Sequence, residues 1–327
     1  MYNKENILER IKIITRNFDN EKILNKYTGE ENHMYNQGIL INKWDPVTLS
    51  SGYPGIILLY SELERQFPYE NWKELKHKFI GLLVDQIHST GLNSTSMFSG
   101  ISGVATAVFA ASNNREDYSK LLSKLNELLV YNIKLELDNM DIKNAKMEDY
   151  DIIEGLAGKL NYLLLVSDDE KNREIIFEVL NKLIGYTNDK EYLGRNIMGF
   201  HISPNNMFLE FEKEMFPNGF INTGFAHGIS GVLISLVNAA NKNIIVEGQI
   251  VAIEKIMDIL LKSIIRNNKR MYWDYVISFE EFINKNKTIF DKKLTSYRDA
   301  WCYGVPGISL ALYSAADFLK KRILKWI

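Results

Sequence analysis

The sequence repeats a short glycine motif five times, and this recurrence limits the folds open to the chain. Each copy is followed by a run of apolar and small residues, such as residues 104–111 after the second copy. Glycine lets the backbone turn tightly, and self-similarity at a period near 50 residues is typical of helical repeat arrays. The copies of Gly-x-x-Gly are Gly52–Gly55, Gly100–Gly103, Gly155–Gly158, Gly228–Gly231 and Gly304–Gly307.

Longer segments between the glycine motifs have the spacing of amphipathic helices. In the segment 245–265, Ile253, Ile256 and Leu260 fall at three- and four-residue steps, whereas Lys255 lies off that stripe. This spacing predicts a helix with one buried and one exposed face. The same pattern occurs in residues 6–18, 72–87, 118–137 and 173–184.

The predicted chain therefore alternates apolar helices with amphipathic ones, and a glycine turn begins each apolar helix. A helix that is apolar nearly all round belongs in an interior, so we expect apolar helices in an inner layer and amphipathic helices in an outer layer. Such helix pairs build an all-α solenoid, or a toroid if the array closes. The glycine turns would then gather at one end of the array, where we expect a functional site.

Two segments interrupt the repeat and account for its longer spacings. Residues 185–221 contain two prolines and scattered glycines, and residues 269–297 contain the string MYWDYVISFEEF. Its near-alternation of apolar and polar residues predicts a short strand or a hairpin. We expect both segments to be loop or β insertions beside the glycine turns, within a single domain that spans residues 1–327.

Composition excludes several classes of protein. The chain of 327 residues carries a net charge of −2, so it lacks the basic surface of a nucleic-acid-binding protein. No apolar run approaches the roughly 20 residues that span a bilayer, and the first residues lack the apolar core of a signal peptide. The single cysteine, Cys302, excludes an internal disulfide and fits a reducing compartment. We therefore expect a cytoplasmic protein.

The fifth glycine motif carries the residue with the most distinctive chemistry. Cys302 lies between Trp301 and Tyr303, immediately before Gly304. A helix N-terminus favours negative charge and so favours the thiolate form of a nearby thiol, which is the form that binds metal or attacks carbon. The alternative is that an isolated cysteine acts as a small buried apolar residue.

Three strings that contain glycine motifs resemble the lanthionine synthetase C family, the lantibiotic cyclases. They are DIIEGLAG at residues 151–158, PNGFINTGFAHGISG at 217–231 and RDAWCYGVPG at 298–307. The resemblance runs over essentially the whole chain, and the last two strings are specific. It implies an α/α toroid, a double ring of seven inner and seven outer helices, of which about five helix pairs are present. It also implies a zinc ion at the mouth of the toroid, held by two cysteines and one histidine.

The resemblance further implies that the protein closes thioether rings. The family adds the thiol of a peptide cysteine to dehydroalanine or dehydrobutyrine in a precursor peptide, which forms lanthionine or methyllanthionine. The implied partners are this dehydrated precursor peptide and the dehydratase and transporter of a lantibiotic synthesis complex. Through such partners the protein would lie at the inner face of the membrane.

The same resemblance assigns roles to individual residues. Cys302 resembles the first zinc ligand, and Tyr303 lies beside it. His227, in Ala-His-Gly-Ile, resembles the histidine that performs acid–base catalysis or stabilises the enolate. Asp151 resembles the carboxylate that orients this histidine, and Arg298 resembles a site arginine that binds charge.

Each of these residues also has a structural interpretation. His227 can pack in a core or cap a turn, Asp151 can be the N-cap of a capping box that ends at Glu154, and Arg298 can form a surface ion pair. The remaining histidines carry no motif, and we expect them to be structural or exposed to solvent. They are His33, His77, His88 and His201.

The sequence departs from the family pattern after Cys302. In the family a later Cys-His-Gly motif supplies the second cysteine and the histidine ligand, and seven glycine repeats are expected where this chain has five. We therefore expect a chain cut short at its C-terminus, with a zinc site that Cys302 alone cannot complete and an exposed apolar flank on the fifth inner helix. The alternative to a cyclase is an inactive family member that binds a peptide or a partner without zinc.

Two other enzymes built on helical toroids fit the sequence less well. A glycosidase needs two opposed carboxylates, whereas Asp151 and Glu154 lie three residues apart on one turn. A terpene cyclase needs an aspartate-rich metal motif, for which the pair Asp168 and Asp169, in a polar stretch between helices, is a poor candidate.

Overall fold

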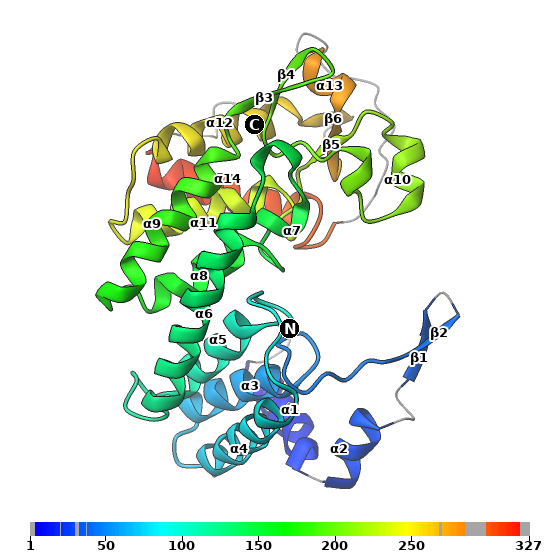
Figure 1. The fold of residues 1–327 in the computed structure, drawn as a ribbon. Helices are drawn as coiled ribbons and strands as arrows, with labels where there is room; N and C mark the ends of the chain where they lie inside the picture. The colour runs from blue at the N-terminus through cyan, green and yellow to red at the C-terminus, as the bar shows by residue number, and fades with distance from the viewer. Residues whose placement is uncertain are drawn as a thin grey trace. The chain divides into compact units, whose positions relative to one another are not determined.

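The computed structural model describes residues 4–19, 21–29, 33–36, 38–267, 270–284 and 299–320. These residues form fourteen α-helices, and their strands are confined to four two-stranded sheets (Figure 1). The predicted all-α class is therefore confirmed. The chain divides into two compact units, Met1–Leu128 and Leu129–Ile327, each of which is described by itself. The prediction of a single domain stays a prediction.

In the first unit, α3 packs against α4 and α5. The helices α3 and α5 each follow a glycine motif, whereas α4 is one of the predicted amphipathic helices. A short 3-10 turn, η1 (Asn17–Asp19), follows α1. The helices and strands are α1 (Lys4–Arg16), α2 (Glu21–Thr28), β1 (His33–Asn36), β2 (Ile39–Asn42), α3 (Tyr53–Gln66), α4 (Trp72–Thr90), α5 (Ile101–Ala111) and α6 (Ser119–Asn139), within which the division between the units falls.

Aromatic side chains form the centre of the first unit. Tyr60, Trp72 and Phe79 are fully buried, and the ring centroid of Tyr60 lies 6.0 Å from that of Trp72 and 5.3 Å from that of Phe79. The Tyr60 hydroxyl donates a hydrogen bond of 3.2 Å to the carbonyl oxygen of Thr15. The opening helix is thus held to the core by a buried polar contact as well as by apolar packing.

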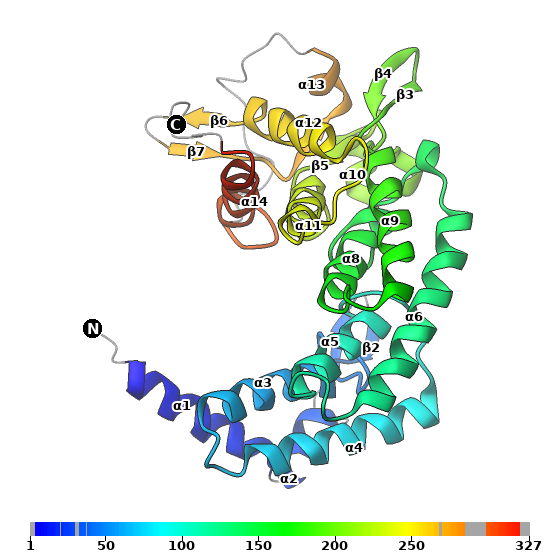
Figure 2. The same ribbon diagram turned by 90° about the vertical axis from the view of Figure 1, so that its left-hand side faces the viewer.

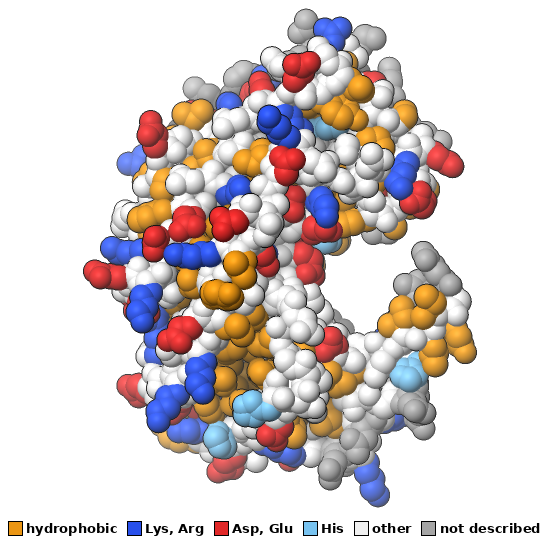
Figure 3. All heavy atoms as spheres, viewed as in Figure 1, with side chains coloured by type: hydrophobic (Ala, Val, Ile, Leu, Met, Phe, Trp, Pro, Cys, Tyr) orange, Lys and Arg blue, Asp and Glu red, His pale blue; other side chains and the backbone are white. Residues whose placement is uncertain are grey.

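The hairpin β1–β2 is an element that the sequence analysis did not predict. Its strands pair antiparallel, with Met34 opposite Ile41 and Tyr35 opposite Leu40. All four of these side chains are exposed, and Figure 3 shows apolar side chains of this hairpin at the molecular surface. The hairpin was missed because its apolar residues do not alternate with polar ones, which is the pattern that marks a half-buried strand.

In the second unit, α11 lies between α8 and α14 and also packs against α12 (Figure 2). Nearly every residue of α11 is buried, whereas α9 and α12 bury one face and expose the other. The expected division into inner and outer helices is confirmed for these elements. The helices are α7 (Met147–Tyr150), α8 (Leu156–Leu165), α9 (Glu170–Gly185), α10 (Glu210–Met215), α11 (Ile229–Asn241), α12 (Gln249–Lys262), α13 (Phe279–Ile283) and α14 (Val305–Phe318).

The fifth glycine helix, α14, exposes part of its apolar surface. Leu310 is 54% exposed and Tyr313 is 71% exposed, although the opposite face of the helix, which includes Ile308 and Ala315, is buried. This face is the exposed apolar flank that the sequence predicts for the fifth inner helix. No helix in the described ranges is long and apolar enough to cross a membrane.

All five glycine motifs begin a helix, and in four of them the geometry explains why the last residue is also glycine. The first glycine of each motif is the N-cap residue of α3, α5, α8, α11 or α14. A Cβ atom on the second glycine would point at the carbonyl oxygen of the residue six positions earlier: Leu49, Met97, Phe225 and Trp301 for Gly55, Gly103, Gly231 and Gly307. The preceding loop thus folds back against the first helical turn, where any side chain would collide.

The two predicted insertions contain short strands, as expected, and some of these strands pair with strands outside their own insertion. Residues 189–198 form one hairpin, whereas β8 pairs with β5, from the other insertion, with Ile221 opposite Ile277. The segment 269–297 contains the strand β8, as the short-strand alternative predicts, and also the strand β7, which pairs antiparallel with β6 just before the segment. Residues 285–298 lie outside the described residues. The strands are β3 (Asp189–Tyr192), β4 (Arg195–Met198), β5 (Phe220–Asn222), β6 (Ile265–Asn267), β7 (Arg270–Tyr272) and β8 (Val276–Ser278), with 3-10 turns η3 (Ile142–Asn144) and η4 (Pro204–Asn206).

The close approach beneath the second glycine predicts that two glycine-to-alanine substitutions in the first unit have opposite effects on the free energy of unfolding. Gly103→Ala places a Cβ against the Met97 carbonyl oxygen and 2.9 Å from the Leu49 Cβ, so we expect it to lower the free energy of unfolding by about 2 kcal/mol or more. Gly81→Ala, within α4, meets no atom within 4 Å and should raise it by about 0.5–1 kcal/mol. Urea unfolding of both variants measures the difference, and equal effects would contradict the proposed crowding.

His201 predicts a pH dependence of stability in the second unit. The side chain is 1% exposed, its Nε2 atom lies 2.9 Å from the carbonyl oxygen of Asn218, and its ring centroid lies 4.4 Å from that of Tyr192. Burial lowers the pKa of His201 to about 4. The expectation of a structural role for this histidine is confirmed.

Because the folded-state pKa lies below the unfolded-state value, the unfolded chain binds a proton between about pH 6.5 and pH 4 that the folded chain does not. This group therefore removes about 2 kcal/mol of stability between pH 7 and pH 5. His201→Gln keeps a hydrogen-bond donor but cannot titrate, so its urea midpoint should fall less steeply with acid than that of the wild type. Parallel acid slopes for the two proteins would show that His201 is not the group responsible.

Candidate functional site

The glycine turns that precede α8, α11 and α14 are joined by backbone hydrogen bonds. The amide of Ile152 donates to the carbonyl oxygen of Ala226 at 3.1 Å, and the amides of Phe225 and Ala226 both donate to the carbonyl oxygen of Cys302, at 2.9 and 3.2 Å. Within the second unit these three turns therefore meet at one end of the inner helices, as the repeat pattern predicts. The meeting point brings Asp151, His227 and Cys302 into one region.

His227 and Asp151 form the central contact of this site. The Nδ1 atom of His227 lies 2.5 Å from the Oδ2 atom of Asp151, whose side chain is completely buried, whereas the His227 side chain is 26% exposed. Because a carboxylate only accepts hydrogen bonds, the neutral ring carries its hydrogen on Nδ1. The Nε2 atom is then left with a lone pair for proton transfer.

Asp151 is also the cap of the turn that leads into α8. Its Oδ1 atom accepts hydrogen bonds from the amides of Glu154 and Gly155, at 2.7 and 2.8 Å. The interpretation of Asp151 as a helix N-cap is wrong, because Gly155 is the N-cap of α8. The Asp151 side chain instead caps the preceding turn through Oδ1 and contacts His227 through Oδ2. The amide of Asp151 itself bonds to the Met147 carbonyl oxygen rather than to the side chain of Glu154.

Tyr303 lies beside the histidine on the next turn. Its ring centroid is 6.4 Å from that of His227, and burial raises the pKa of its hydroxyl, although a hydrogen bond with the Asn222 side chain opposes this rise. Asn222 is itself buried, and its Oδ1 atom accepts a hydrogen bond of 2.9 Å from the amide of Gly224. Tyr303 therefore keeps its proton at neutral pH and is held by an oriented amide.

Sequence reasoning missed three residues of this site, namely Asn222, Gly224 and Phe208. A Cβ on Gly224 would lie 2.6 Å from Cδ1 of the Tyr303 ring and 2.9 Å from the Cys302 carbonyl oxygen, so only glycine leaves room for these neighbours. Phe208 packs its ring edge-on to His227, with 5.8 Å between centroids. Asn222 and Gly224 stand in the string that carries the family resemblance, which was a signal for them, whereas nothing in the sequence marked Phe208.

The structure does not test two of the predicted assignments. Arg298 lies outside the described residues. Cys302 is a partly exposed free thiol, but the described part of the chain contains no group of three or more His, Cys, Asp or Glu residues that could hold a metal ion. A structural or catalytic zinc needs at least three protein ligands, so these residues alone do not fit a complete zinc site.

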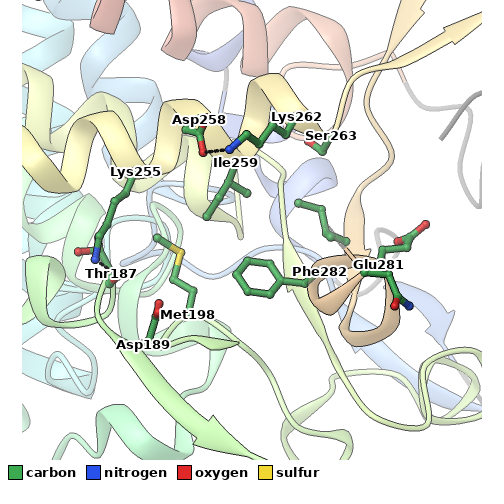
Figure 4. Close-up of a pocket in the computed structure, with 12 residues that line it drawn as sticks. Thr187, Asp189, Met198, Lys255, Asp258, Ile259, Lys262, Ser263, Glu281 and Phe282 are labelled. Atoms are coloured by element: carbon green, nitrogen blue, oxygen red, sulfur yellow. Dashed lines mark hydrogen bonds and ion pairs between the residues drawn. The ribbon is translucent and has the colours of Figure 1, made fainter. Parts of the chain in front are cut away.

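A separate pocket of about 290 Å³ lies along α12, beside β3, β4 and α13 (Figure 4). Its cationic groups already have partners, because Lys262 lies 2.6 Å from Asp258 and the Lys255 ammonium donates to the Thr187 carbonyl oxygen at 3.3 Å. None of the site residues predicted from the sequence lines this pocket.

These features define a class of protein: an all-α repeat protein in which a buried aspartate orients a histidine beside a thiol-bearing glycine turn. A family model described as "Lanthionine synthetase C-like protein" matches residues 43–326. The chain belongs to this family.

Known proteins agree with this assignment. The chain is 31% identical over 310 residues to the nisin biosynthesis protein NisC of Lactococcus lactis subsp. lactis, a match that covers 95% of this chain and 69% of that protein. It also matches the solved structure of nisin cyclase with a TM-score of 0.79 and 29% identity, over 97% of this chain and 72% of that chain. The predicted α/α toroid is therefore confirmed as the fold class.

Proposed function

We propose that this chain closes thioether rings in a dehydrated precursor peptide, as a lanthipeptide cyclase. The observation that carries the proposal is the buried Asp151 carboxylate, which holds His227 beside the turn of Cys302 and Tyr303. Family membership and the similarity to a nisin cyclase support it. The substrates are a peptide cysteine thiol and a dehydroalanine or dehydrobutyrine residue.

The reaction needs one proton removed and one proton returned. The peptide thiol loses its proton, and the resulting thiolate forms a carbon–sulfur bond to the β-carbon of the dehydro residue. The π electrons move onto the carbonyl oxygen as an enolate, and protonation of the α-carbon then restores the carbonyl group. All atoms of the peptide are retained, so the catalyst has only to hold the two groups together and to move protons.

His227 is suited to both proton transfers. Its Nδ1 atom is engaged with Asp151 at 2.5 Å, which leaves Nε2 to accept the thiol proton and to return a proton to the α-carbon. The Asp151 carboxylate stabilises the imidazolium that forms between the two transfers. Because Asp151 is tied to two backbone amides, it cannot rotate away when the histidine changes its charge.

Tyr303 supplies a neutral hydrogen-bond donor at the same site. Burial raises the pKa of its hydroxyl, so the hydroxyl stays protonated at neutral pH and is able to donate to a developing enolate oxygen. We propose that Arg298, from outside the described residues, provides a positive charge for the same oxygen. Both roles concern charge that appears during the reaction and is absent from the free peptide.

Zinc enters this proposal only through Cys302. We propose that Cys302 is one ligand of a zinc ion whose further ligands come from outside the described residues, and we derive no step through that ion. The alternative function, binding of a peptide or partner without zinc and without catalysis, is favoured by the single cysteine in the chain. In either case we propose a cytoplasmic protein that meets its dehydrated peptide beside a dehydratase and a transporter.

Substitution of the paired residues tests the catalytic proposal. With a dehydrated peptide that carries one free cysteine, His227→Gln should lower the rate of ring closure by about 10²–10⁴. Asp151→Asn should lower the rate by about 10² or more because the histidine loses its orienting charge. Loss of maleimide-reactive thiol, followed by mass spectrometry, measures ring closure in the presence and absence of added zinc.

The exposed histidine His88 at the end of α4 provides the matched control, and His88→Gln should close rings at the wild-type rate. Thermal unfolding of each variant separates lost chemistry from lost folding. Unchanged ring closure by a folded His227→Gln variant would remove the acid–base role of this histidine. A wild-type chain that binds the peptide without closing a ring would support the alternative function.

Elemental analysis tests the zinc assignment. Because we propose that ligands from outside the described residues complete the site with Cys302, we expect zinc in the purified protein, and we expect Cys302→Ala to lose it. Zinc that stays bound in Cys302→Ala would contradict the ligand role of Cys302, and a wild-type protein without zinc would support the alternative function.

A further inference from the structure

The short helix α10 and the two residues before it expose most of their apolar side chains. Four apolar side chains are exposed: Phe208 is 49%, Leu209 46%, Phe211 54% and Met215 45% exposed. The charged residue Glu212, in contrast, is buried. A surface helix of a globular protein normally turns its apolar side chains inward. This segment instead exposes apolar side chains to solvent, together with the charged residues Glu210 and Glu214.

The buried carboxyl group anchors the segment in this orientation. Glu212 has a hydrogen bond with Tyr275, and burial raises the pKa of the Glu212 carboxyl group. Phe216, at the end of the helix, is buried, and its ring centroid lies 5.4 Å from that of Phe220 and 6.2 Å from that of Tyr275. The exposed side chains are therefore held outward by contacts on the opposite side of the helix.

This exposed surface is continuous with the candidate site. Phe208, the first residue of the segment, packs edge-on against His227 at 5.8 Å between ring centroids. Tyr275, which holds Glu212, lies 6.1 Å from Tyr303. A peptide whose reacting residue meets His227 must therefore pass over or beside Phe208.

We infer that Phe208, Leu209, Phe211 and Met215 form an apolar strip that binds apolar side chains of the precursor peptide next to its reacting dehydro residue. This inference rests on the proposed function, because the peptide is the occupant to which it commits. Isolated apolar residues at a surface need no explanation, whereas four on one short segment that begins at the catalytic histidine form a patch of the kind that binds ligands. The strip would position the dehydro residue and would set a preference for peptides with large aliphatic neighbours.

Binding to a peptide that cannot react tests the strip separately from catalysis. The probe is a fluorescein-labelled linear peptide with one dehydrobutyrine flanked by isoleucine and leucine, in which alanine replaces cysteine. Fluorescence anisotropy with the full chain should show Phe211→Ser and Leu209→Ser binding about tenfold more weakly than the wild type, which corresponds to about 1.4 kcal/mol. Phe177→Ser, on the exposed face of α9, is the matched control and should bind within twofold of the wild type.

A second peptide, with serine in place of the flanking isoleucine and leucine, completes a double-mutant cycle between the protein and the peptide. The wild type should bind this second peptide about tenfold more weakly than the first. Phe211→Ser should bind both peptides with nearly the same affinity, because its contact with the apolar side chains is already absent. With a cysteine-bearing peptide, Phe211→Ser should raise KM about tenfold and leave kcat within twofold. Those results together distinguish a peptide contact from a general effect on folding.

Several results would overturn the inference. They are wild-type affinity in Phe211→Ser and Leu209→Ser, equal weakening in Phe177→Ser, and no measurable peptide binding by the wild type. A change from dimer to monomer in Phe211→Ser by sedimentation, with peptide affinity unchanged, would assign the strip to a contact between two copies of the chain. Failure of the proposed function has a different signature, since the wild type would then bind the peptide through the strip without closing a ring.

Discussion

The contact on which the helical array depends is the approach of a loop carbonyl oxygen to the second glycine of four of the five motifs. At Gly103, Gly231 and Gly307 a Cβ atom would collide with the carbonyl oxygen six residues earlier. Because no side chain intervenes, each loop folds flat against the first turn of its helix, and loops from neighbouring repeats come close enough for backbone hydrogen bonds. The bonds from Phe225 and Ala226 to the Cys302 carbonyl oxygen are an example. A requirement of packing thereby brings functional side chains of distant repeats together.

Asp151 shows how one residue links this architecture to chemistry. One carboxylate oxygen accepts two backbone amides of its own turn, and the other holds Nδ1 of His227 on a neighbouring turn. A completely buried carboxylate is costly unless it is well hydrogen-bonded, and these contacts remove that cost. The same contacts give the histidine one fixed orientation, so the stability of the turn and the geometry of the site are not separable.

The parts of this structure that could be predicted from the sequence are those with a strong periodic or motif signal. The apolar runs after each glycine pair identified α3, α5, α8, α11 and α14, and the family strings identified His227, Asp151, Cys302 and Tyr303. The β5–β8 pairing could not be predicted, because it joins two insertions more than 50 residues apart and leaves no local pattern. Phe208 was also beyond prediction, since only the fold brings this residue to the ring of His227.

The strip on α10 and the exposed flank of α14 are both apolar surfaces, but they differ in what lies next to them. Leu310 and Tyr313 belong to a helix whose other face packs in the repeat array. The strip on α10 lies outside the glycine repeat, and on the inner side of this helix the buried Glu212 bonds with Tyr275 while Phe216 packs against Phe220. The exposed apolar side chains of the strip contribute little to the core, and they lie beside an oriented histidine. Ligand binding explains this arrangement better than folding does.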